Sequence, residues 1–233
     1  MRRTERGIGL VEILIALVLG LVVVLGITQI FVSSKQSFVM QDASARMQED
    51  ARYALTRITQ DIRAAGVFGC FPVASITNAP SEFGAPVSWV NPVLSLVTSR
   101  PSSGNSAVNG AAWAVHTDCK TTAEVKSDGS SPALGSIAIP IDLIRYKFEG
   151  GSLKVSKGVA ANYQDLIGGV KVFEIKFGVS AGSSDTYVGS YVEAGAATPA
   201  NIRSVRVRIV MDGGGKVKDQ EYIVVAALRN RLL

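Results

Sequence analysis

The sequence predicts an α+β fold in which one long N-terminal helix packs on a C-terminal antiparallel β-sheet. Two patterns carry this prediction. From residue 8 to residue 66 the apolar residues recur at spacings of three and four, which is the period of a helix. From residue 137 onward, short runs alternate apolar and polar residues, as half-buried strands do. Because the strands follow one another with short turns, we expect antiparallel pairing with one sheet face on the helix.

The first half of the helix, residues 8–32, is apolar enough to cross a membrane. It holds about 25 residues, and at about 1.5 Å per residue it exceeds the roughly 30 Å of hydrocarbon in a bilayer. Arg2, Arg3 and Arg6 outweigh Glu5 before it, so the N-terminus is expected in the cytoplasm and the rest of the chain outside. A secretory signal peptide fits less well, since its apolar core is shorter and a small-x-small cleavage site follows.

The second half, residues 33–66, is amphipathic. Arg46 with Asp50 and Arg57 with Asp61 are four apart and are expected to pair on its charged face. The glycine at the end of this range is expected at the C-cap. The opposite face is an apolar stripe formed by Met47, Ala51, Ala54, Leu55, Ile58, Ile62 and Ala65.

Residues 67–136 are rich in proline, serine, glycine and asparagine. These residues divide the region into short extended pieces such as 87–90 and 93–97, and we expect an irregular connecting region. Cys70 and Cys119 both lie in it, on the outer side of the membrane by the charge argument. In an oxidising compartment they are expected to form a disulfide, and closing a loop of about 50 residues would stabilise the fold by roughly 4 kcal/mol. A zinc site is not expected, because there is no CxxC and His116 is the one histidine.

Residues 137–233 are expected to form the antiparallel sheet. The clearest strand alternates Val205 and Val207 on one face with Arg206 and Arg208 on the other. The expected strands cover residues 137–148, 152–155, 170–179, 204–211 and 220–228.

One carboxylate, Glu12, interrupts the apolar segment. Placing it there costs roughly 2.5 to 3.5 kcal/mol on insertion scales, unless it reaches the nearby cytoplasmic surface or finds a partner. The run GIGLVE, residues 7–12, resembles the class III signal of type IV prepilins and type II secretion pseudopilins. The resemblance implies a leader, residues 1–7, that a dedicated prepilin peptidase removes by cutting between Gly7 and Ile8. It also implies that Ile8 is then methylated on its amine.

Cleavage would place the charged amine of Ile8 only about 6 Å of helical rise from Glu12. In a stack of such helices, Glu12 of one subunit can pair with the Ile8 amine of its neighbour. A subunit out of register would leave a buried charge uncompensated, so the pair would fix the register of assembly. The sequence departs from the commonest pilin pattern in having Ile8 in place of phenylalanine and Gln29 where major pilins often carry proline.

Three later segments narrow the resemblance. They are ARYAL at 51–55, DIRAAG at 61–66 followed by Gly69 and Cys70, and VVAALRNR at 224–231, and they resemble PilW-type minor pilins of type IV pili. The family implies the type IV pilin fold and a subunit at the pilus tip that primes assembly with other minor pilins and the major pilin. Before assembly the subunit would sit in the inner membrane with its domain in the periplasm. No catalytic residue carries over from the family, and we expect no cofactor or metal site.

Alternatives remain at this stage. A J-type pseudopilin of a type II secretion system shares the same signal. A membrane-anchored enzyme or binding module is weakened by having only His116 as a histidine and no GxSxG, HExxH or phosphate loop. Asp185 and Glu193 could contribute to a calcium site of the kind that some pseudopilins have, but their spacing matches no EF-hand-like loop. Nucleic-acid binding through Arg206 and Arg208 has little support from the net charge. The whole chain has a formal net charge of +5, the leader accounts for +2 of it, and the remaining chain would carry only about +3.

Overall fold

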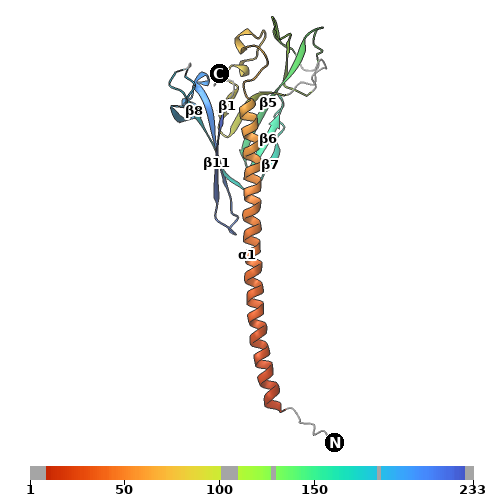
Figure 1. Ribbon diagram of the computed structural model, residues 1–233, viewed down its shortest axis with the longest axis vertical. Helices are drawn as coiled ribbons and strands as arrows, with labels where there is room; N and C mark the ends of the chain where they lie inside the picture. Colours follow the sequence, from red (N-terminus) through yellow and green to blue (C-terminus); the bar gives the residue numbers. More distant parts are fainter. Residues whose placement is uncertain (1–8, 101–109, 127–129, 183–184, 229–233) are drawn as a thin grey trace.

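A computed structural model describes residues 9–100, 110–126, 130–182 and 185–228. It has a stalk and a head (Figure 1). The stalk is the first part of one continuous helix, α1 (Leu10–Ala64), which is about 80 Å long at 1.5 Å per residue. The second part of α1 runs into the head and lies among the strands. The expected leader, residues 1–7, and the first expected helical residue, Ile8, lie outside the described residues.

The head contains two antiparallel sheets, which confirms the α+β class. The described strands form a seven-stranded sheet and a four-stranded sheet. The first sheet consists of β1 (Val87–Val90), β2 (Val93–Ser99), β3 (Trp113–Thr117), β4 (Ala123–Lys126), β5 (Ile137–Glu149), β6 (Ser152–Lys157) and β7 (Gln164–Ile167). The second consists of β8 (Val170–Val179), β9 (Ser190–Glu193), β10 (Ile202–Met211) and β11 (Gln220–Ala227). Short 3-10 helices are η1 (Val73–Ser75), η2 (Ser81–Phe83), η3 (Ala194–Ala196) and η4 (Pro199–Asn201).

Strand β5 organises the first sheet. It is 13 residues long, and three strands pair with different parts of it. Its first part pairs with β3, its middle with β2 and its last part with β6. The main strand order is therefore β1-β2-β5-β3-β4. Strand β6 pairs with the last part of β5, and β7 pairs with β6. The second sheet has the order β11-β10-β8-β9.

The extended pieces expected at residues 87–90 and 93–97 are strands β1 and β2, but the expectation of an otherwise irregular region over residues 67–136 needs correction. This region supplies β1, β2, β3 and β4, which are four strands of the first sheet. Its prolines mark turns between short strands, as at Pro92 between β1 and β2, and do not prevent pairing. The long strand β5, distant in sequence, provides the partner that these short strands need.

The expectation of one sheet over residues 137–233 also needs correction. The chain changes sheets between β7 and β8, which are consecutive in sequence and separated only by Gly168 and Gly169. Gly169 has φ +66°, in the left-handed region that glycine adopts without strain. This turn takes the chain out of the first sheet and starts the second.

The apolar stripe on the second half of α1 packs into the main core. The stripe is confirmed, except that Leu55 is only partly buried. The helix ends at Ala64, close to the expected stop, and Gly66 has φ +79°. The buried stripe residues are Met47, Ala51, Ala54, Ile58, Ile62 and Ala65, and the same core contains buried residues of both sheets such as Tyr146, Leu153, Ile175, Val207 and Ile209.

A polar contact also fixes α1 against β5. The hydroxyl of the fully buried Tyr146 donates to Asp61 Oδ2 at 2.5 Å, and Arg57 Nε donates to the same oxygen at 3.3 Å. Burial and the neighbouring carboxylate raise the pKa of Tyr146 far above its usual value, so its hydroxyl keeps its proton. The expected pair of Arg57 with Asp61 is confirmed. Arg46, by contrast, pairs with Asp42 at 3.0 Å and not with Asp50.

Candidate functional site

The first half of α1 exposes an apolar surface that nothing in the described chain covers. Every residue from 10 to 32 is exposed, from Leu10 at 75% to Val32 at 46%. The most apolar 18-residue window of the helix has a mean hydropathy of 3.0, and α1 is long and apolar enough to cross a membrane. Soluble monomers rarely expose contiguous apolar patches above a few hundred Å². This surface therefore requires lipid or another protein against it.

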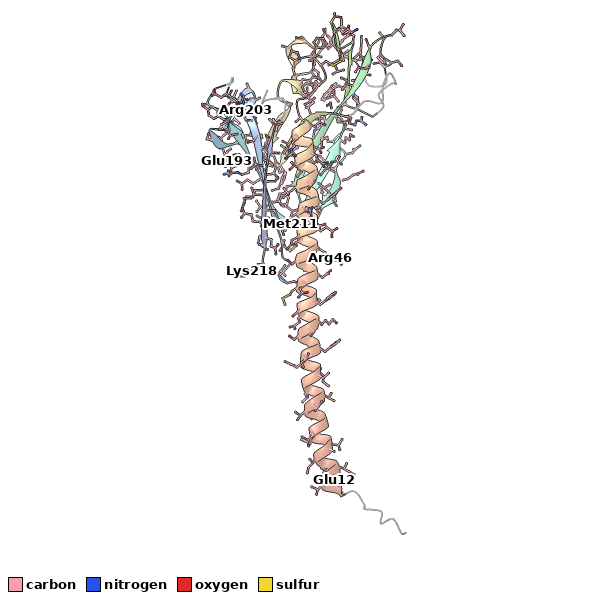
Figure 2. The ribbon with its side chains drawn as sticks, viewed as in Figure 1. Glu12, Arg46, Glu193, Arg203, Met211 and Lys218 are labelled. Atoms are coloured by element: carbon pink, nitrogen blue, oxygen red, sulfur yellow. A yellow bond between two sulfur atoms is a disulfide. The ribbon has the colours of Figure 1, made fainter. Side chains whose placement is uncertain are left out.

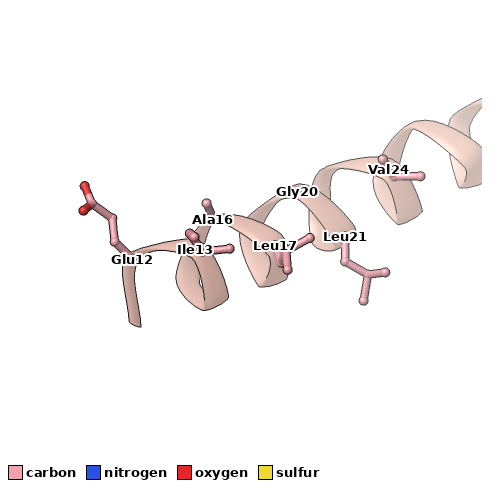
Figure 3. A pocket seen from close by; sticks show the side chains of 7 residues that line it. All are labelled: Glu12, Ile13, Ala16, Leu17, Gly20, Leu21 and Val24. Carbon is pink, nitrogen blue, oxygen red and sulfur yellow. The ribbon is translucent and has the colours of Figure 1, made fainter. Parts of the chain in front are cut away.

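Glu12 lies at the far end of this surface, in the first turn of α1 (Figure 2). Gly9 is the N-cap and offers no side chain to the first turn. The backbone N–H of Glu12 donates to Gly9 O at 3.0 Å, while its carboxylate is exposed and points away from the helix (Figure 3). An acidic group in the first turn interacts favourably with the helix dipole. Gly7 and Ile8, the expected cleavage and methylation residues, lie outside the described residues.

A shallow groove begins at Glu12 and runs along one face of α1 (Figure 3). Ala16 and Gly20 form its small-residue floor, and a Cβ added at Gly20 would meet nothing within 4 Å apart from the neighbouring backbone of α1 itself. Small residues four apart let two membrane helices approach closely. The sequence-based reasoning missed this groove, although the four-residue spacing of Glu12, Ala16 and Gly20 was the available signal. The groove is lined by Glu12, Ile13, Ala16, Leu17, Gly20, Leu21 and Val24.

The structure confirms the disulfide between Cys70 and Cys119, whose Cα atoms are 5.3 Å apart. It joins the segment after α1 to the turn after β3. The neighbouring Asp118 orders this turn, because its Oδ1 accepts the backbone N–H groups of residues 120–122 at 2.9 Å each. With the hydroxyl of Thr121, these donors hold the pKa of Asp118 well below its usual value.

His116 lies within β3 and is 8% exposed. Its Nε2 is 3.3 Å from the hydroxyl oxygen of Ser130. Burial lowers the pKa of His116, and the nearby Lys126 lowers it further, so the imidazole is neutral at pH 7. Over the described ranges, no group of three or more His, Cys, Asp or Glu residues is placed to hold a metal ion.

Arg206 and Arg208, the candidates for nucleic-acid contact, lie on the second sheet with their charges engaged. Arg208 bridges Glu174 at 3.0 Å and Glu221 at 2.9 Å. The guanidinium of Arg206 stacks on the ring of Tyr191, 3.9 Å from its centre. Phosphates would have to compete with these contacts, so this face gives little support to nucleic-acid binding.

A scan against models of known protein families found no match to this chain, and a search of curated proteins found no significant relative. A functional proposal therefore rests on the motif at residues 7–12 and on the arrangement of stalk and head. The residues that the structure brings together at the stalk are Glu12, Ala16 and Gly20.

Proposed function

We propose that this chain is a PilW-type minor pilin, a non-catalytic subunit that primes the assembly of a type IV pilus and stays at its tip. One observation carries the proposal. A single helix is buried in its own head from Met47 onward and is exposed and apolar over residues 10–32, with Glu12 in its first turn. A membrane protein that later enters a filament needs such a helix, because lipid covers the apolar half first and neighbouring helices cover it afterwards.

The processing steps follow from the same proposal. Prepilin peptidase removes residues 1–7, and the new N-terminal residue, Ile8, is methylated. Before assembly the chain crosses the inner membrane once, with its head in the periplasm, where the disulfide between Cys70 and Cys119 can form. The partners are the other minor pilins and the major pilin, whose helices would pack against the stalk.

Glu12 gives this packing its register. In a filament core the carboxylate would leave water, and burying it alone is costly. The Ile8 amine of a neighbouring subunit supplies the compensating charge. The groove floor at Ala16 and Gly20 lies on the same face as Glu12, so a close helix–helix approach and the charge pair would use one face together.

Replacing Glu12 by glutamine tests this function. Glu12→Gln keeps the side-chain volume and removes the charge, so insertion into the membrane should remain while co-purification of partner pilins falls by at least about tenfold, or 1.4 kcal/mol. Leu14→Met, on the opposite face of the helix and close in volume, is the matched control and should keep partner recovery near the unmodified level. Equal recovery with Glu12→Gln and the unmodified chain would contradict the pairing mechanism.

A further inference from the structure

Strand β11 is an unprotected edge of the second sheet. It is eight residues long, and within the described residues it pairs only with β10. Edge strands usually carry lysine, proline or a bulge that prevents another strand from pairing with them. Apart from Glu221 near its start, the β11 sequence, QEYIVVAA, has no charged residue and no proline, and its pairing with β10 has no register shift. The edge is therefore a ready template for a further strand.

The backbone of β11 points free hydrogen-bonding groups away from β10. Just beyond the strand, the N–H of Leu228 donates to Arg203 O at 2.9 Å. In an antiparallel pair every second residue bonds to the partner strand, so the even-numbered residues of β11 bond to β10. The odd-numbered positions 221, 223, 225 and 227 accordingly direct their N–H and C=O groups to the outer edge. Their backbone groups have no partner among the residues that the structure describes. Two of their side chains, Ile223 and Val225, are also 53% and 45% exposed.

A groove runs beside this edge, between β11 and α1. Its apolar part includes Leu55, Tyr222 and Val224, each partly buried. Thr59 also lines it, is 9% exposed, and has no hydrogen-bond partner for its Oγ1 among the described residues. A buried hydroxyl left without a partner is destabilising unless a bound group supplies one. The groove thus combines an apolar surface with one hydroxyl group, that of Thr59, which can hydrogen-bond to a bound segment.

The charge of the groove indicates what would bind. Arg52 and Arg63 line it and are exposed, and neither forms an ion pair within the described ranges. They are 11 residues apart, which places them about 16 Å apart along the helix. On an extended strand, residues i and i+4 face the same side about 13 Å apart, so two acidic side chains at that spacing can reach both arginines.

We propose that β11 receives an extended segment of a partner protein as an added strand. The segment carries two acidic residues four apart that face Arg52 and Arg63, an apolar residue between them that enters the groove at Leu55, and apolar residues on its other face beside Ile223 and Val225. Main-chain hydrogen bonds to the free edge give affinity, and the charged groove selects the sequence.

A second copy of this chain does not fit the same edge. Antiparallel pairing of β11 with itself would bring two positively charged grooves together. It would also direct the two α1 helices in opposite directions, because α1 runs beside β11 (Figure 1). Two helices so directed cannot enter one membrane with the same orientation, a step that rests on the function proposed above. The β11 sequence also carries one acidic residue where the proposed segment needs two, so the partner that we propose is a different chain.

A synthetic peptide can test the strand addition on the full-length protein in detergent. The probe is the fluorescent peptide Thr-Glu-Val-Leu-Val-Glu-Thr, and the control peptide has lysine in place of both glutamates. Fluorescence anisotropy should show binding of the glutamate peptide and at least tenfold weaker binding of the lysine peptide. Hydrogen exchange with the bound glutamate peptide should slow at the amides of residues 221, 223, 225 and 227. The readout is at β11 and does not depend on processing at Ile8.

Two variants make the test specific. Val225→Pro removes an outward N–H without removing a bond to β10, so it should keep the thermal unfolding midpoint and weaken peptide binding at least tenfold. Val225→Thr, which keeps the backbone groups, should bind nearly as well as the unmodified chain. The double variant Arg52→Glu with Arg63→Glu should prefer the lysine peptide, and this reversal would also show that the variant is folded. The proposal is overturned if the unmodified chain binds neither peptide, or if both altered chains bind the glutamate peptide unchanged.

Discussion

The two halves of α1 have the same secondary structure and opposite surroundings. In the second half, Ala51, Ala54 and Ile58 have no exposed surface, because both sheets of the head pack around them. In the first half, residues 10–32 are all exposed although they are more apolar. An apolar helix face therefore predicts that the face is buried, but it does not predict whether the same chain, another protein or lipid buries it. The head covers α1 from Met47 onward, and residues 10–32 must be covered by something other than the described part of the chain.

The largest expected effect contrasts a buried residue with an exposed one on the same helix. Ile58→Ala should lower the free energy of unfolding of the head by about 2 to 5 kcal/mol, through lost burial and the cavity left behind. Leu17→Ala, at a residue 65% exposed, should leave it unchanged. Denaturant unfolding of the full chain in detergent, followed by tryptophan fluorescence, would measure both. An equal loss for both variants would remove the contrast between the halves.

A smaller effect is expected at the polar contact that fixes the second half to β5. Tyr146→Phe removes the hydroxyl that donates to Asp61 and leaves that largely buried carboxylate with one donor fewer, so stability should fall by about 1 to 3 kcal/mol. The control is Tyr53→Phe, at an exposed tyrosine of the same helix, with no expected change. Thermal unfolding midpoints would separate the two, and a stable Tyr146→Phe variant would show that packing alone fixes the helix.

The smallest effect concerns the two ion pairs on α1. Arg57→Ala breaks the pair with Asp61, whose side chain is only 15% exposed, and should cost roughly 0.2 to 1 kcal/mol. Arg46→Ala breaks a pair with Asp42, 48% exposed, and should have no measurable effect. Denaturant unfolding at low and at high salt would sharpen the contrast. Because Asp61 is largely buried, salt should reduce the stability loss of Arg57→Ala only in part. A larger loss for Arg46→Ala than for Arg57→Ala would be inconsistent with the burial pattern.

The helix could be predicted from the sequence because its signals are local. The three- and four-residue spacing at Met47, Ala51, Ala54, Ile58 and Ile62 requires only a helical period to be recognised. Leu55 belongs to the same pattern but lies at the margin of the stripe, beside β11, and is only partly buried. Likewise, Arg46 has a carboxylate four residues away on each side, and spacing alone could not show that it pairs with Asp42.

The sheets were predicted less well because strand pairing joins distant residues. Short strands such as β3 and β4 have weak local patterns, and their place in the sheet depends on β5. The division into two sheets depends on the turn at Gly168 and Gly169, which resembles a hairpin turn in the sequence. The groove beside β11 combines α1 with a strand more than 150 residues later in the chain, so no sequence window contains it.

We propose that the exposed half of α1 belongs to a processed pilin. The most direct test is the intact mass and N-terminal sequence of the protein extracted from its native membrane. We expect a chain that begins with N-methylated Ile8, with Glu12 at its fifth position and the disulfide between Cys70 and Cys119 intact. A chain that still begins at Met1 in cells with active prepilin peptidase would contradict the claim and make α1 a simple membrane anchor.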